Sequence, residues 1–113
     1  MLQTYPSILR LRGPVDFQTV WRKGKRISMP PLAIISCANQ LTYPRLGISI
    51  AKKNIRLAVQ RNRLKRLVRE TFRVRQTKLS GRDIVVVVYK GAEVLAPKEQ
   101  YQRLNALWDA LMR

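Results

Sequence analysis

The segment that decides the fold is Arg61-Asn62-Arg63-Leu64-Lys65-Arg66-Leu67-Val68-Arg69-Glu70. At about 100° per residue, the less polar side chains of this region fall on one side of a helix: Leu64, Leu67, Val68, Thr71 and Val74. The opposite side gathers cationic and amide donors, namely Arg61, Asn62, Lys65, Arg66, Arg69 and Arg73. Such a helix has one face for a protein core and one for a polyanion. A merely solvated face is the alternative, but these donors are opposed by no acid and would repel one another without an anionic partner.

The charge of the whole chain agrees with this interpretation. Its 113 residues include 23 Lys and Arg against 6 Asp and Glu, which gives a formal net charge of +17. Ten of the basic residues lie within residues 52–75, where Glu70 is the single acid. A charge focused in this way favours nucleic acid or an anionic membrane as partner. The hydrophobic fraction of 46% excludes a disordered basic tail and suits one core.

Several classes of protein are disfavoured by what the sequence lacks. Its longest apolar run, residues 84–89, is too short to span a bilayer. The first residues lack the pattern of a signal peptide and Cys37 is the single cysteine, so we expect a cytoplasmic protein without disulfides and without a membrane partner. There is no histidine and the six acids are scattered, so we expect no catalytic centre and no intrinsic metal site in this chain.

The remaining segments predict a single α+β domain over residues 1–113, in which a sheet is packed with helices. We expect an extended arm at residues 1–12 and helices at 15–23, 55–77 and from Pro97 onward. We expect strands at 32–38 and 45–50, paired as a hairpin, and a central strand at 84–89. The inner face of the last helix should carry Tyr101, Leu104, Leu107, Trp108 and Leu111.

One family shares these motifs. Lys52-Lys53, then Ala58, then the run from Arg61 to Arg73 closely resemble the signature of the bacterial ribonuclease P protein family. Three further segments are similar to the family in order and spacing: residues 16–26, 45–53 and 81–87. The resemblance covers about 100 residues. It implies a two-layer sandwich, like the second domain of a small-subunit ribosomal protein, with helices on one side of a four-stranded sheet and a left-handed strand–helix–strand crossover. General rules alone would favour a right-handed crossover.

The resemblance also implies a function. The family provides the accessory protein subunit of a ribonucleoprotein endonuclease that removes the 5′ leader of precursor tRNA. The catalytic centre and the Mg²⁺ ions that it uses would belong to the RNA subunit. We therefore expect a monomeric protein, one copy per ribonuclease P RNA, that binds this RNA and the leader, supports the folded RNA and raises its affinity for metal ions.

Site residues follow from the same resemblance. The residues expected to bind the RNA subunit are Arg61, Asn62, Arg63, Lys65, Arg66, Arg69 and Arg73, with Asn62 a candidate for an indirect metal contact. The leader is expected in a cleft between the first helix and the sheet. Its residues would be Phe17 and Trp21 as aromatic faces, Ala33 and Ile35 as the floor, and Lys52 and Lys53 as phosphate partners. Either aromatic ring could instead belong to the core.

Three other functions remain open at this point. A ribosomal or other structural RNA-binding protein would show similar charge, and the RNA that it binds would separate the two. A DNA-binding protein with residues 61–73 as recognition helix is disfavoured because no second helix forms the usual turn with it. A protein nuclease acting alone is disfavoured by the missing histidines and the scattered acids.

Overall fold

The computed structural model describes residues 10–11 and 14–113, and of residues 14 and 15 it describes the backbone alone. Of the arm expected at residues 1–12, only Arg10 and Leu11 are among the described residues. In chain order the elements are α1 (Pro14–Lys23), β1 (Lys25–Met29), β2 (Leu32–Ala38), β3 (Arg45–Ile50), α2 (Ala58–Arg73), η2 (Gln76–Leu79), β4 (Arg82–Val88), η3 (Ala92–Val94) and α3 (Pro97–Leu111). The predicted α+β class and its four-stranded sheet are confirmed.

The strands are arranged in the order β1-β2-β4-β3. β2 is antiparallel to both β1 and β4, and β3 is parallel to β4 with α2 in the connection between them. The expected hairpin between residues 32–38 and 45–50 is therefore wrong. β2 pairs instead with β1, the strand that precedes it in the chain. The sequence did not predict β1 because Ile27 and Met29 are its only apolar residues.

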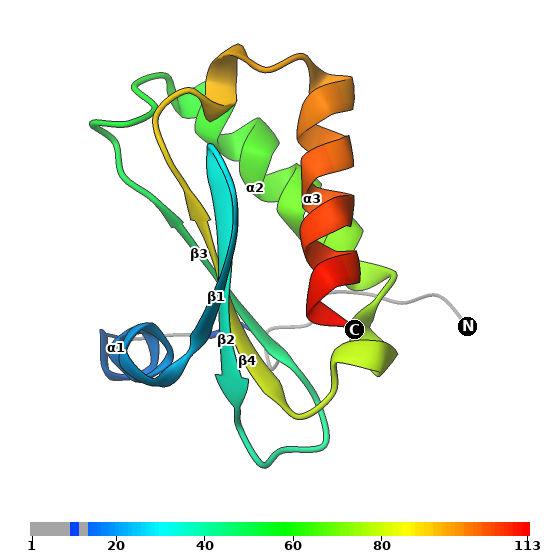
Figure 1. The fold of residues 1–113 in the computed structure, drawn as a ribbon. Helices are drawn as coiled ribbons and strands as arrows, with labels where there is room; N and C mark the ends of the chain where they lie inside the picture. Colours follow the sequence, from blue (N-terminus) through cyan, green and yellow to red (C-terminus); the bar gives the residue numbers. More distant parts are fainter. Residues whose placement is uncertain (1–9, 12–13) are drawn as a thin grey trace.

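Helices cover both faces of the sheet. α2 and α3 pack on one face and α1 lies against the other (Figure 1). The one-sided arrangement implied by the resemblance is therefore wrong for α1. The physical reason lies in β4, whose residues from Asp83 to Val88 are all buried. A strand that is apolar on both faces needs cover on both sides, and the central position predicted for it is confirmed.

α1 ends where only a glycine fits. The amide of Gly24 donates to the carbonyl of Val20 at 2.7 Å. A Cβ at Gly24 would lie 2.4 Å from that same oxygen and 2.5 Å from a methyl carbon of Ile35. The close approach lets the chain turn directly from α1 into β1, which brings the helix down onto the sheet.

The apolar stripe of α2 is fixed by α3. Leu64, Val68, Thr71 and Phe72 are the buried residues of α2. The indole Nε1 of Trp108 donates to the hydroxyl of Thr71 at 2.8 Å, and its ring lies 5.8 Å from that of Phe72. Val74 was expected on this stripe but follows the helix and is exposed. The contact with Trp108 sets which side of α2 faces the core and which faces outward.

The inner face of α3 differs from the prediction at one position. Leu104, Leu107, Trp108 and Leu111 are buried as expected, but Tyr101 is 52% exposed. Gln100 takes the inward position, where its Nε2 donates to the carbonyl of Ala92 at 2.8 Å. A buried amide needs such a partner, and η3 supplies it.

Candidate nucleic-acid interface

The cationic α2 face consists of the seven residues predicted to bind an RNA subunit: Arg61, Asn62, Arg63, Lys65, Arg66, Arg69 and Arg73. Asn62, Arg63, Arg66 and Arg69 are exposed, and the other three are half-buried. Asn62, Arg63, Arg66, Arg69 and Arg73 lie on the side of α2 that is turned away from Leu64 and Val68, whereas Arg61 and Lys65 lie beside the buried stripe. Because the helix is rigid, their donors are presented as one surface rather than as separate flexible charges.

Two members of the cationic α2 face also work within the protein. Nη1 of Arg61 donates to the carbonyls of Ile55 at 2.8 Å and Arg56 at 2.9 Å, which closes the loop that precedes the helix. Arg73 pairs with Glu70 at 3.0 Å. Arg63 and Arg66 form no ion pair with any residue that the structure describes. These two guanidinium groups are therefore the most available for an external anion.

A second group of cations surrounds the start of α2. A hollow of about 860 Å³ is lined by Lys52, Lys53, Asn54, Arg56, Leu57, Gln60, Lys90 and Glu93. The predicted phosphate partners Lys52 and Lys53 are both exposed here. The first turn of α2 contains no acid and has no side-chain cap, so its free amides add positive potential.

Lys90 was missed by reasoning from the sequence. It belongs to this hollow because β3 and β4 run parallel, with Ile50 opposite Val88. Residues that follow the two strands therefore emerge at the same end of the sheet. The signal was present in the sequence as a lysine shortly after each strand, but it could not be used without the parallel pairing.

The two predicted aromatic residues lie in different surroundings. Phe17 lies over β3, where a Cβ at Gly47 would be only 2.5 Å from its Cζ. Trp21 is 52% exposed and lines a small hollow of about 290 Å³ with Gln18 and Arg22. Phe17 thus faces the sheet while Trp21 is turned toward the outer side of α1.

Ala33 and Ile35 offer no surface to a ligand. Their exposed fractions are 0% and 3%, and both are packed in a cluster with Val20, Val85 and Val87. They support α1 from beneath, so the direct floor contact expected of them does not fit their burial. The physical reason is that α1 covers this part of the sheet.

The α1 and α2 surfaces meet around the outer edge of β3. A hollow of about 330 Å³ is lined by Arg10, Leu11, Phe17, Leu46, Gly47, Ile48, Lys65 and Arg69. The amide of Leu11 donates to the carbonyl of Leu46 at 2.8 Å, so Arg10 and Leu11 lie along this edge. The structure thereby brings Phe17 together with Lys65 and Arg69, which the sequence had assigned to separate surfaces.

Another aromatic and cationic pair lies on the α1 side of the sheet. The guanidinium of Arg26 lies 5.4 Å from the centre of the Tyr89 ring and donates to its hydroxyl. Arg26 is opposite Ile35 in the register of β1 and β2, which places it on the same face as α1. Because the two residues are far apart in sequence and β1 was not predicted, no sequence signal pointed to this pair.

The one carboxylate within the four described strands, that of Asp83, is already occupied. Asp83 accepts from Arg45 Nε at 2.8 Å, from Arg45 Nη2 at 2.7 Å and from Asn39 at 2.9 Å. The hydrogen bond to Asp83 is the main cause that raises the pKa of Arg45. Among the residues that the structure describes, no three His, Cys, Asp or Glu side chains gather as a metal site would require. The described residues offer hydrogen-bond donors that suit phosphate rather than a set of metal ligands.

Burial is the main cause that raises the pKa of the Cys37 thiol, and the charge of Asp83 adds to it. A raised pKa leaves little thiolate for nucleophilic attack.

Within the described residues, no helix is both long and apolar enough to cross a membrane.

Similarity to known proteins extends over nearly the whole chain. A family model described as Ribonuclease P matches residues 5–112. A ribonuclease P protein component of Vibrio cholerae serotype O1 is 43% identical over 105 residues, which cover 93% of this chain and 89% of that protein. The corresponding protein of Edwardsiella ictaluri is 42% identical over 105 residues, covering 93% of this chain and 88% of that one.

Solved structures agree with these relatives. The ribonuclease P protein of Staphylococcus aureus is 29% identical, with a TM-score of 0.84 and coverage of 91% of this chain and 94% of that one. The ribonuclease P protein of Thermotoga maritima is 31% identical, with a TM-score of 0.75 and coverage of 92% and 96%. The similarity therefore extends from sequence to fold over nearly the full length of both chains.

Proposed function

Because this chain belongs to the ribonuclease P protein family, we propose that its cationic α2 face binds the ribonuclease P RNA while α1 and the neighbouring sheet bind the 5′ leader of precursor tRNA. The chain is the protein subunit of ribonuclease P, a ribonucleoprotein that acts as a ribonuclease in tRNA processing. The relatives do not favour a ribosomal protein or another structural RNA-binding module.

The observation that carries the proposal is the array of exposed donors on α2. Arg63 and Arg66 present guanidinium forks that match phosphate oxygens bidentately. Asn62 can donate to a phosphate or to a water bound to a metal ion that the RNA holds. Each phosphate neutralised by a cation releases counterions from the RNA, so binding should weaken steeply with salt. Lys65, Arg69 and Arg73 extend the same surface.

The leader would run from the hollow at the outer edge of β3, where the α1 and α2 surfaces meet, toward the start of α2. Phe17, Lys65 and Arg69 line that hollow, and Lys52 and Lys53 line the hollow at the start of α2. Trp21 adds an exposed indole on the outer side of α1. Stacking on an aromatic face accepts any base, at about 1–3 kcal/mol per base. This tolerance suits leaders of differing sequence.

Hydrolysis itself we assign to the RNA subunit. The chain has no histidine, and Asp83 and Asp16 are both within reach of Arg45. The described residues do not gather the ligands of a magnesium site, so the RNA subunit would hold the magnesium ions of the reaction. The protein would act by positioning substrate and stabilising the folded RNA. We also propose that residues 1–113 act as one domain, as a monomer, with one copy per RNA subunit.

A reconstitution assay tests the proposal. Protein freed of RNA should not cleave precursor tRNA, but should accelerate leader removal by the RNA subunit at low magnesium. The double variant R63Q/R66Q should bind the RNA subunit more weakly. K78Q/K98Q is a matched control because it removes the same charge from exposed positions outside α2. Cleavage by the protein alone, or equal binding by R63Q/R66Q and the control, would overturn the proposal.

A further inference from the structure

The proposed function leaves unassigned a hollow at the β1 edge of the sheet, which we call the β1-edge hollow. Its volume is about 660 Å³, and its polar lining includes Lys23, Lys25, Ser36, Ser80, Arg82 and Arg113. These residues come from the end of α1, from β1 and β2, from the start of β4 and from the segment after α3. We propose that the β1-edge hollow binds an RNA sugar–phosphate backbone, at a site separate from the cationic α2 face. This inference rests on the proposed function.

The charged side chains that line the β1-edge hollow are all of one sign. None of its lining residues is an acid. Lys23 and Lys25 are exposed, so neither ammonium group is buried among protein atoms. Asp83, the acid next to Arg82 in sequence, is held by Arg45 and Asn39. The acid at the outer side of α3, Asp109, lies 3.9 Å from Arg75. The positive potential of the hollow is therefore not neutralised by these neighbouring carboxylates.

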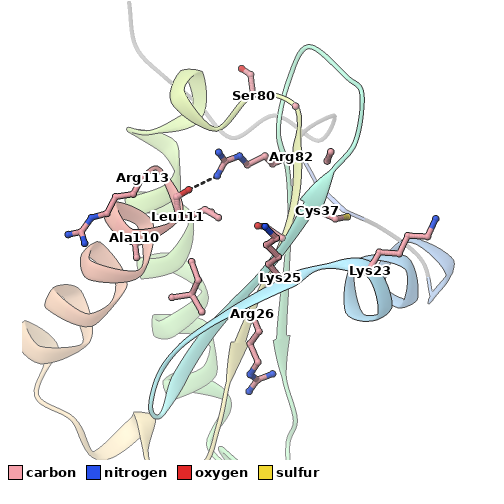
Figure 2. A pocket seen from close by; sticks show the side chains of 13 residues that line it. Lys23, Lys25, Arg26, Cys37, Ser80, Arg82, Ala110, Leu111 and Arg113 are labelled. Carbon is pink, nitrogen blue, oxygen red and sulfur yellow. Dashed lines mark hydrogen bonds between the residues drawn. The ribbon is translucent and has the colours of Figure 1, made fainter.

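The arrangement of the cations suits an extended anion. Figure 2 shows Lys25 near the middle of the hollow, with Lys23 toward one side and Arg113 toward the other. The guanidinium of Arg26 points away from this row, in keeping with its hydrogen bond to Tyr89. Charges spread along a line cannot converge on one small ion, but they can follow successive phosphates of a backbone. Ser36 and Ser80 add hydroxyl donors to the lining.

Structural roles explain part of this cluster. Arg82 donates through Nη1 to the carbonyl of Leu111 in the last turn of α3 (Figure 2), and cations are favourable at the negative end of a helix. A lysine on an edge strand also discourages pairing with other chains. Lys23 has the role of a helix-end cation in α1, because it lies in the last turn of that helix. These separate roles do not explain why cations from α1, β1, β4 and the segment after α3 line one hollow, and an anionic ligand would explain it.

The location determines what kind of RNA could fill the site. α3 packs beside β1 while α2 packs beside β3, and these strands are the opposite edges of the sheet. The cationic α2 face and the β1-edge hollow therefore lie toward different edges of the sheet. A large folded RNA can reach both edges with two different segments. The backbone could belong either to ribonuclease P RNA or to the body of the precursor tRNA.

Salt dependence of binding tests the β1-edge hollow. The variants are K25Q and K23Q/K25Q, and K98Q is the control because it removes one exposed lysine at the start of α3, away from the hollow. The slope of log K against log salt is negative, and each lost phosphate contact should make it shallower by roughly 0.7–0.9. We expect K23Q/K25Q to reduce the magnitude of the slope by about 1.5 for the RNA subunit, and K98Q to leave it unchanged. Thermal unfolding should be the same for all three.

Two arms separate the sources of RNA. One measures binding of the protein to the RNA subunit, and the other measures binding of precursor tRNA to the reconstituted holoenzyme. A change in the first arm assigns the site to the RNA subunit, and a change in the second alone assigns it to the tRNA. If K23Q/K25Q matches the wild type in both arms while R63Q/R66Q is weakened, the β1-edge site is refuted and the proposed function stands. If R63Q/R66Q also binds normally, the proposed function fails.

Discussion

Arg45 grips Asp83 through two parallel hydrogen bonds, from Nε at 2.8 Å and from Nη2 at 2.7 Å. The Asp83 side chain is only 8% exposed, whereas Arg45 reaches the surface and lies 3.8 Å from Asp16 of α1. One guanidinium group therefore connects the central strand β4, the edge strand β3 and the helix that carries Phe17 and Trp21. The position of the candidate leader surface depends on this link.

Asp83→Asn should destabilise the fold by about 2–3 kcal/mol. The amide cannot supply two charged acceptors, and breaking a buried ion pair leaves the other charge poorly solvated; the value is lowered because Arg45 is partly exposed. Urea unfolding measures the loss. The matched control is Asp109→Asn, since Asp109 is mostly exposed and 3.9 Å from Arg75, so that its effect should stay below about 1 kcal/mol. Equal losses would contradict the role of the pair.

Gly47→Ala should displace α1. The new Cβ would lie 2.5 Å from Cζ of Phe17, and crowding of this kind destabilises by about 1–3 kcal/mol. The clash should disappear when Phe17 is shortened, so the double variant F17A/G47A should lose less stability than the two single losses added together. Denaturant unfolding of the four proteins provides the cycle. Strict additivity would show that Phe17 does not lie over Gly47 in solution.

Arg61 and Arg63 should separate stability from binding, although both belong to the cationic α2 face. R61Q removes the donor to the carbonyls of Ile55 and Arg56 and should lower the free energy of unfolding by about 1–2 kcal/mol. R63Q changes an exposed residue and should stay within about 0.5 kcal/mol, while weakening RNA-subunit binding. Denaturant unfolding measures the stability of both variants, and filter binding measures their affinity for the RNA subunit. Equal losses of stability in R61Q and R63Q would contradict the structural role of Arg61.

Trp21→Ala should weaken binding of precursor tRNA but not of mature tRNA. Loss of one stacked base corresponds to about 1–3 kcal/mol, or a decrease in affinity of roughly fivefold to a hundredfold. Since Trp21 is half exposed, the fold should persist. Gln18→Ala is the control because Gln18 lines the same small hollow without an aromatic face. A loss of equal size for both tRNAs would exclude a leader contact at Trp21.

Cys37 should react slowly with iodoacetamide at neutral pH. Burial raises the pKa of the thiol, and Asp83 raises it further, against smaller opposite effects of Lys23 and Arg45. Because the thiolate is the reactive form, a raised pKa means a smaller reactive fraction at pH 7 and a rate that keeps rising in alkaline solution. The pH profile of alkylation, compared with a small free thiol, measures this. A profile that levels off at lower pH than the free thiol would contradict it.

Local patterns predicted α2, β2 and the buried character of β4, because burial follows periodicity along one segment. They could not predict that β3 lies beside β4, since two apolar strands carry no mark of which neighbour they will choose. Gln100 and Tyr101 show the same limit on a smaller scale. Gln100 precedes Leu104 by four residues and Leu107 by seven, so it lies on the apolar side of α3, but its polar side chain hid this in the sequence. The carbonyl of Ala92 supplies the partner that the buried amide needs. Likewise the meeting of Phe17 with Lys65 and Arg69 is a property of the edge of the sheet and of no single segment.

The hydrogen bond from Trp108 to Thr71 helps to fix the rotation of α2 about its own axis. Consecutive side chains on a helix differ in direction by about 100°, so a rotation of one residue would point Leu64 and Leu67 outward where Arg63 and Arg66 now stand. The pattern of charge offered to an RNA therefore depends on an indole that lies inside the core. Substitutions in α3 that leave the protein folded can still change its RNA recognition, because they can rotate α2 and so change which of its side chains face outward.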